Sequence, residues 1–237
     1  NKLDEEQTAK VIYTHYGRSA EAAFPIIIYG KPVVSVDTSG YDGSWTSGDV
    51  TFTLDSTHKL DGVKYYYNIN GGEWTEMNSN TLTVSESTNA VYAFKSVNSA
   101  GIESYSTQSY AVKIDKTVAS FNLVQDVTEI TNQSYCVKIT DLQVGISGVK
   151  AVYLNGDAID SQSEFTVTQN GEYTVKVVSN SLLESEKTIK IENIDTQKPT
   201  VTEVTVAHKD TKDFARLVNK MTFGLFFNKA TQLTVKA

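Results

Sequence analysis

The feature that most constrains the fold of this chain is a motif that returns after about 80 residues. Tyr92-Ala93-Phe94-Lys95 is echoed by Tyr173-Thr174-Val175-Lys176, and the segment from Tyr110 to Asp115 is echoed by the segment from Lys190 to Asp195. Each copy then runs into a new extended segment. A repeat of this length can bury one small β-sandwich core. The sequence therefore predicts an array of similar small domains.

Alternation of apolar and polar residues within each copy predicts β-strands. Val50, Phe52 and Leu54 point to one side of their run, as the period of two in a half-buried strand requires. Asn70-Gly71 and Asn155-Gly156 predict hairpin turns, because these residues tolerate positive φ. Roughly seven runs of this kind per copy match the strand number of an immunoglobulin-like sandwich. The predicted fold class is all-β, with tandem immunoglobulin-like β-sandwiches.

The repeat also predicts how the chain divides. The expected parts are C-terminal strands of a preceding repeat, two complete domains, and the N-terminal part of a further repeat, over residues 1–30, 31–117, 118–197 and 198–237. A helix from Glu5 to Ala23 is the alternative for the first part, and Thr14, Gly17 and the β-branched residues weaken it.

The two incomplete parts raise the possibility of self-association. Met221 to Phe227 resembles the strand from Val50 to Leu54, and Pro199 repeats the entry at Pro32. Half-domains leave unpaired strand edges. The C-terminal part of one molecule could pair head to tail with the N-terminal part of another and complete one sandwich. The alternative is that the chain is a piece of a longer protein.

Composition and motifs exclude several function classes. The net charge is −7 and no basic stripe is present, which argues against nucleic-acid binding. No apolar run of about 18 residues predicts a membrane span. His15, His58 and His208 lie far apart without further ligands at zinc-binding spacing. No nucleophile elbow, phosphate-binding loop or dinucleotide fingerprint is present. We expect a protein that is not an enzyme, without catalytic or metal-ligating residues.

Aspartates leave calcium as an alternative to the absence of any cofactor. Asp37, Asp42 and Asp49 frame a loop rich in Gly and Ser, and Asp115 and Asp195 lie at the predicted domain junctions. Several carboxylates that converge could hold Ca²⁺ and stiffen the array. Aspartate at turns more commonly accepts a hydrogen bond from the nearby backbone. We therefore expect no cofactor, with calcium as the minor alternative.

Two local features give sharper expectations. Cys136 is the single cysteine and lies in an alternating run, so it is expected to be a buried core residue and not a reactive thiol. The segment Asn170-Gly171-Glu172-Tyr173 places a Tyr directly after a turn. This pattern predicts a tyrosine corner, in which the hydroxyl binds the nearby backbone.

Aromatic residues in the first copy are the candidates for ligand binding. Trp45, Tyr65, Tyr66, Tyr67 and Trp74 are crowded into one part of this copy. Tyr65 and Tyr67 share one face of a strand, and Tyr66 takes the other. Exposed rings can stack on sugars or anchor a protein partner, so Trp45, Trp74 and Tyr66 are predicted site residues. The favoured alternative is that Trp74 packs in the core or across its hairpin.

With these segments in view, the chain resembles bacterial immunoglobulin-like repeats, which occur in large surface proteins and multi-modular secreted enzymes of Gram-positive bacteria. The resemblance is carried by Trp45 to Phe52, Asn70 to Trp74, Asn98 to Ser104, and Ile114 to Thr117. It covers residues 31–237, although the second copy lacks the Trp-bearing segments.

The resemblance implies a non-catalytic structural or adhesive stalk segment of an extracellular protein, located at the cell surface or attached to the cell wall. Its partner would be a protein or a glycan on a host or neighbouring cell. The alternative is an accessory carbohydrate-binding or spacer module of a secreted multi-modular enzyme. An exposed platform of Trp45 and Trp74 would favour the carbohydrate-binding alternative.

Overall fold

The computed structural model describes residues 3–160, 162–201, 203–208 and 231–236. All regular secondary structure in these ranges is β-strand. The chain divides into two compact units, Asn1–Thr128 with Ser134–Glu192, and Glu129–Gln133 with Asn193–Ala237. The first unit contains a hairpin and two β-sandwiches, and the second contains a two-stranded sheet.

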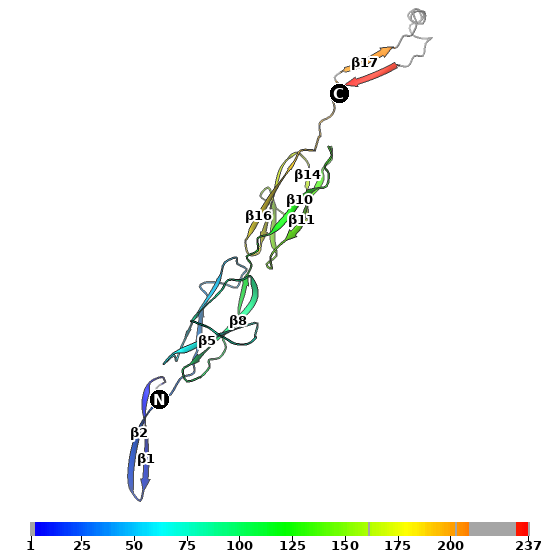
Figure 1. Cartoon of the computed structure of the whole chain (residues 1–237). Helices are drawn as coiled ribbons and strands as arrows, with labels where there is room; N and C mark the ends of the chain where they lie inside the picture. Colours follow the sequence, from blue (N-terminus) through cyan, green and yellow to red (C-terminus); the bar gives the residue numbers. More distant parts are fainter. Residues whose placement is uncertain (1–2, 161, 202, 209–230, 237) are drawn as a thin grey trace, which may run out of the picture. The chain divides into compact units, whose positions relative to one another are not determined.

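The first sandwich consists of two antiparallel sheets (Figure 1). One sheet has the order β3 (Val34–Asp37), β4 (Val50–Ser56), β7 (Thr81–Val84). The other has the order β6 (Thr75–Glu76), β5 (Val63–Ile69), β8 (Thr88–Asn98), β9 (Tyr110–Ile114). The fourth strand of the domain, β6, pairs with the third, whereas in constant-type immunoglobulin domains the fourth strand joins the sheet of the first.

The second sandwich repeats this strand order (Figure 1). Its three-stranded sheet is β10 (Ser120–Gln125), β11 (Tyr135–Gln143), β14 (Glu164–Val167). Its four-stranded sheet is β13 (Asp157–Ile159), β12 (Val149–Leu154), β15 (Gly171–Ser179), β16 (Glu184–Ile191). The predicted tandem of immunoglobulin-like sandwiches is confirmed. In both domains the first and last strands are edge strands of different sheets.

The two cores differ in composition. The first core centres on Phe52, whose ring lies 4.9 Å from Phe94 and 5.7 Å from Tyr110, measured between ring centroids. The alternation predicted for Val50, Phe52 and Leu54 is confirmed, because all three are buried. The second core is mainly aliphatic, with five valines at most 2% exposed: Val137, Val152, Val167, Val175 and Val177.

The N-terminal segment is a hairpin of β1 (Glu6–His15) and β2 (Arg18–Ile27), so the helix alternative for this segment is wrong. Tyr16 and Gly17 form its turn with φ values of 40° and 74°, as a two-residue hairpin turn with both central residues at positive φ requires. Its large apolar side chains are 38–93% exposed, with Val11, Tyr13 and Phe24 at 50% or more.

The second unit contains the antiparallel pair β17 (Glu203–His208) and β18 (Thr231–Lys236). The strand predicted from Met221 to Phe227 lies outside the described residues. The membership of the two terminal hairpins in incomplete repeats stays a prediction. No helix within the described ranges has the length and apolar character that a bilayer crossing demands.

The two local expectations have different outcomes. The Tyr173 hydroxyl donates a hydrogen bond to the Gln169 carbonyl at 2.9 Å, which confirms the tyrosine corner. The prediction that Cys136 is buried in the core is wrong, because Cys136 is only half-buried, with its Sγ 3.8 Å from Thr166 Oγ1. The alternation of β11 places Tyr135 and Val137 in the core and turns the residue between them outward.

Candidate functional site

The three consecutive tyrosines of β5 divide between the two faces of the sheet, as predicted. Tyr65 is 8% exposed, and Tyr67 packs against the first core. Tyr66 lies on the outer face and is half-buried. The alternation leaves this one ring free to join a surface cluster.

Tyr66 and Trp74 share a lysine on the outer face of the four-stranded sheet. The Lys95 ammonium lies 5.0 Å from the ring centroid of Trp74 and 5.6 Å from that of Tyr66, within the range of a cation–π interaction. Glu103 pairs with Lys95 at 3.0 Å, and the lysine side chain is only 14% exposed. The Tyr66 hydroxyl donates to Glu76 Oε2 at 3.1 Å. We call Tyr66, Trp74, Lys95, Glu103 and Glu76 the aromatic face.

Trp45 does not belong to the aromatic face. Its neighbour Thr46 forms a bridge with Ile114 of β9, while Trp74 precedes β6 at the other edge of the same sheet. Counted from Thr46 across β9, β8 and β5 to β6, there are four inter-strand spacings of about 4.8 Å, on the order of 19 Å. The structure therefore brings Tyr66 and Trp74 together but separates Trp45 from them, and all three side chains are half-buried.

The second sandwich retains part of the aromatic face. Lys176 lies 5.3 Å from the ring of Tyr153 and 3.3 Å from Glu184, which repeats the arrangement of Lys95, Tyr66 and Glu103. The residue paired with Tyr153 is Ala158, whereas the residue paired with Tyr66 is Glu76. Because the second sandwich also has no Trp, the two-ring cluster belongs to the first sandwich alone.

A buried carboxylate joins the end of the first sandwich to the second. Asp115 follows β9, has no exposed surface, and accepts hydrogen bonds from Thr117 N at 3.0 Å, Ser147 N at 2.8 Å and Ser147 Oγ at 2.6 Å. Burial alone would raise the pKa of the Asp115 carboxyl, but these hydrogen bonds outweigh it and hold the pKa below its ordinary value. A Cβ at Gly145 would lie 2.1 Å from Asp115 Oδ1, so glycine gives the carboxylate its space. We call Asp115, Ser147 and Gly145 the junction clasp.

The other aspartates considered for calcium have separate partners. Asp37, Asp42 and Asp195 each accept a hydrogen bond from the backbone N–H two residues further on. Asp49 pairs with Lys116 at 2.6 Å, and this bond is the main cause of its lowered pKa. No three His, Cys, Asp or Glu side chains converge on a possible metal position among the described residues. Asp37, Asp42 and Asp195 therefore have the backbone hydrogen bonds that were predicted as the alternative to calcium binding.

One charged contact was missed by sequence reasoning. His58 Nδ1 lies 2.5 Å from Asp4 Oδ2, and Asp4 Oδ1 accepts a hydrogen bond from Gly30 N at 3.0 Å. The Gly30 N–H, together with His58, lowers the pKa of the Asp4 carboxyl below its ordinary value. A Cβ at Gly30 would lie 2.2 Å from His58 Nδ1. The residues are 54 positions apart, and no local pattern indicates such a pair.

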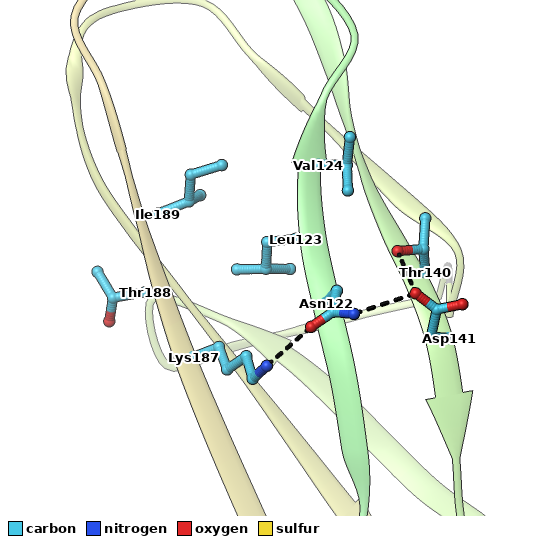
Figure 2. Close-up of a pocket in the computed structure, with 8 residues that line it drawn as sticks. All are labelled: Asn122, Leu123, Val124, Thr140, Asp141, Lys187, Thr188 and Ile189. Carbon is cyan, nitrogen blue, oxygen red and sulfur yellow. Dashed lines mark hydrogen bonds between the residues drawn. The ribbon is translucent and has the colours of Figure 1, made fainter.

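A groove of about 440 Å³ lies along the open side of the second sandwich, between β10 and β16 (Figure 2). Leu123 and Ile189 give it an apolar wall, and Lys187, Asn122 and Asp141 lie in line at its polar end. Lys187 Nζ donates to Asn122 Oδ1 at 3.0 Å, and Asn122 Nδ2 donates to Asp141 Oδ2 at 3.0 Å. Because Lys187 and Asn122 belong to different sheets, the polar row bridges the sandwich.

Comparison with known proteins supports no closer relationship than a shared fold. No protein-family model matches the chain, and no curated protein matches it. The chain is similar to the fibronectin(III)-like modules of CbhA from Clostridium thermocellum, at 14% identity over 69% of this chain and 95% of that one, with a TM-score of 0.30.

Two further solved structures are similar at the same level. The three N-terminal domains of the outer capsid protein Hoc from bacteriophage RB49 match at 13% identity over 87% of this chain and 70% of that one, with a TM-score of 0.32. A Ca²⁺-stabilised, ice-binding adhesin of an Antarctic bacterium matches at 18% identity over 85% of this chain and 59% of that one, with a TM-score of 0.33. A shared fold does not determine function.

Proposed function

We propose that this chain is a non-catalytic stalk segment of an extracellular bacterial surface protein, which holds an adhesive or active part of its parent protein at a distance. The observation that carries the proposal is the junction clasp. A carboxylate without solvent exposure accepts three hydrogen bonds, two of them from the next sandwich. Such a contact limits bending between neighbouring domains. A spacer needs this stiffness, and a flexible linker lacks it.

Contacts of the next residue, Lys116, reinforce the junction clasp. Lys116 N donates to Ser87 Oγ at 3.0 Å, and Lys116 Nζ pairs with Asp49 at 2.6 Å, so the residue after Asp115 is tied back to the first sandwich. Residues 115–119 are the whole connection between β9 and β10. The Gram-positive origin and the attachment to a cell wall are further parts of this proposal, and they rest on the sequence resemblance.

The test is the tumbling of the two sandwiches, measured by ¹⁵N relaxation on the full chain. We expect one common rotational correlation time for both sandwiches, and two different ones in the Asp115→Ala/Ser147→Ala double variant. Asp37→Asn is the matched control, because it alters a similar backbone contact away from the junction. Independent tumbling in the unaltered chain would contradict the stalk proposal.

The aromatic face supports a second candidate, an accessory module that binds carbohydrate. Trp74 and Tyr66 present half-buried rings that Lys95 and Glu76 hold in place. Sugars stack on such rings and hydrogen-bond to charged groups beside them. Binding to a glycan panel that Trp74→Ala abolishes and Trp45→Ala preserves would establish this function. Binding to no glycan, or equal binding by both variants, would exclude the aromatic face as the site.

The terminal hairpins extend the stalk proposal to self-association. The large apolar side chains of the hairpin formed by β1 and β2 are at least 38% exposed, and a two-stranded sheet alone is marginally stable. Head-to-tail pairing with the C-terminal segment of a second copy would cover them. Sedimentation velocity should show assembly that Val11→Lys and Phe24→Lys weaken. A monomer at high concentration would contradict this pairing.

A further inference from the structure

A carboxylate connects the hairpin of β1 and β2 to the first sandwich. Asp4 Oδ2 lies 2.5 Å from His58 Nδ1, and Asp4 Oδ1 accepts a hydrogen bond from Gly30 N at 3.0 Å. On the hairpin side, Asp4 N donates to the Ile28 carbonyl at 2.9 Å. On the sandwich side, Asn98 Nδ2 donates to the Gly30 carbonyl at 3.0 Å, so the sandwich holds both partners of the carboxylate in place. We call Asp4, His58 and Gly30 the hairpin clasp.

The hairpin clasp is largely shielded from solvent and is built around a glycine. The side chains of Asp4 and His58 are 18% and 29% exposed. A Cβ at Gly30 would lie 2.2 Å from His58 Nδ1, so a larger residue at this position would displace the imidazole. The junction clasp also combines a carboxylate with a glycine, but the side chain that donates to its carboxylate is the Ser147 hydroxyl. The two clasps therefore differ in whether this donor can change its charge.

The charge of the hairpin clasp depends on the imidazole. The Gly30 N–H, together with His58, holds the pKa of the Asp4 carboxyl below its ordinary value of about 3.9. Asp4 is therefore ionised throughout the range from about pH 5 to 8, in which histidine side chains change their charge. With a protonated imidazole the contact is an ion pair, and with a neutral one a single hydrogen bond remains.

Other charged groups near His58 and Gly30 in the sequence have partners of their own. These contacts are Asp55 with Lys59 at 2.7 Å, Asp61 with the Tyr29 hydroxyl at 3.2 Å, and Lys31 with the Tyr105 ring at 3.3 Å from its centroid. In the segment between β8 and β9, Glu103 pairs with Lys95 at 3.0 Å. Among the described residues, Asp4 is the carboxylate that His58 meets.

We propose that the hairpin clasp is pH-sensitive, and that it holds the β1–β2 hairpin against the first sandwich firmly when His58 is protonated and weakly when it is neutral. The sign follows from the charges, because a rise in pH removes the positive partner and leaves the Asp4 carboxylate unchanged. The junction clasp keeps its contacts over the same range, since serine does not titrate there and the pKa of Asp115 is lowered. The clasp adds to the proposed stalk a junction whose stiffness depends on pH.

The test is ¹⁵N relaxation of the full chain at about pH 5.5 and about pH 8.5, on either side of most of the histidine range. We expect residues 6–27 of the hairpin to share the rotational correlation time of the first sandwich at the lower pH. At the higher pH the hairpin should show a shorter correlation time than the sandwich, because the ion pair that couples their motion is lost.

Two variants remove the charges, and a third is the control. His58→Asn and Asp4→Asn keep a residue that tolerates the positive φ at these positions, 53° and 57°. In both variants the correlation time of the hairpin should no longer change between the two pH values. His15→Gln should leave the change intact, because His15 contacts the rings of Tyr13 and Tyr16 near the hairpin turn. Asp4 lies outside both sandwiches, so Asp4→Asn tests the clasp even where His58→Asn disturbs its loop.

Two results would overturn the inference. One is an equal correlation time of the hairpin at both pH values in the unaltered chain, and the other is a pH-dependent change that persists in His58→Asn and Asp4→Asn. The two sandwiches should share one correlation time at both pH values in all of these variants. Loss of that common value would contradict the stalk proposal instead, so the stalk and the hairpin clasp can fail separately.

Discussion

The two sandwiches share one strand order but are stabilised by different side chains. The first packs aromatic rings around Phe52, with centroid distances of 4.9 Å to Phe94 and 5.7 Å to Tyr110. The second core is built mainly from valines, and this domain has a polar row across its open side. The backbone pattern of the repeat therefore tolerates a large change in core chemistry, provided that the inward positions of each strand stay apolar.

The surfaces of the two sandwiches differ in a related way. The lysine, glutamate and tyrosine of the outer face occur in both, but only the first sandwich adds Trp74 and Glu76. The second sandwich instead carries Lys187, Asn122 and Asp141 on its open side. The two-ring cluster therefore distinguishes the outer face of the first domain, and the polar row distinguishes the open side of the second.

The largest expected effect tests the difference between the cores. Phe94 is fully buried, and Phe94→Ala should lower the free energy of unfolding of the first sandwich by about 3–5 kcal/mol. Val177→Ala removes less volume from the second sandwich and should cost about 2–3 kcal/mol. Denaturant unfolding of the full chain followed by tryptophan fluorescence measures the first effect, because Trp45 and Trp74 both lie in the first sandwich.

Each variant is the control for the other. Val177→Ala should move the unfolding transition measured by circular dichroism and leave the fluorescence transition in place. If both variants moved the fluorescence transition equally, the two sandwiches would unfold as one unit, and the comparison of two separate cores would fail.

A second prediction tests how far the two sandwiches depend on each other. Asp115 ends the first domain but two of its hydrogen bonds come from Ser147 in the second. Hydrogen bonds to a charged group contribute about 1.5–3 kcal/mol, so Asp115→Asn should lower the stability of the junction by that amount. ¹⁵N relaxation and thermal unfolding measure the change.

The pH dependence of the junction follows from the lowered pKa of Asp115. A carboxyl whose folded-state pKa is depressed contributes stability that is present above its unfolded-state pKa, about 3.9, and lost as pH falls through the folded-state pKa. The two sandwiches should therefore share one rotational correlation time from neutral pH to about pH 4 and show two different ones only in stronger acid. Loss of common tumbling already at pH 6 would contradict this origin.

The regular parts of the fold could be predicted from sequence because they depend on local patterns. The strand from Val63 to Ile69 and the Asn70-Gly71 turn follow from alternation and from tolerance of positive φ, and the structure has both. Tyr173 followed from its place after a turn. Cys136 was misplaced because its run fits either phase of the alternation until its neighbours are assigned to the core.

The candidate site was less predictable because it depends on contacts across strands. Trp45 and Trp74 lie in the same copy of the repeat, yet the strand order puts Trp74 beside one edge of a sheet and Trp45 beside the other. Asn122 and Lys187 are 65 residues apart and meet only because the first and last strands flank the same groove. Sequence spacing carries no information about such pairs, whereas the register of the sheets determines them.

The tyrosine corner gives a smaller prediction that is confined to the second sandwich. Tyr173→Phe removes one hydrogen bond to the Gln169 carbonyl and should lower stability by about 0.5–1.5 kcal/mol. Thermal unfolding by circular dichroism should show the loss, and tryptophan fluorescence should not change. A shift in the fluorescence transition would mean that the corner stabilises more than its own domain.

The smallest effect sharpens the comparison of the two outer faces. Lys95 contacts two rings and is 14% exposed, whereas Lys176 contacts one ring and is 29% exposed. A cation–π contact gains strength as it is desolvated, and exposed ion pairs contribute little. Lys95→Met should therefore cost about 1 kcal/mol and Lys176→Met about 0.5 kcal/mol in chemical denaturation. Equal costs would show that Trp74 adds nothing to the stability of the first face, and the case for a recognition role of that ring would then rest on glycan binding alone.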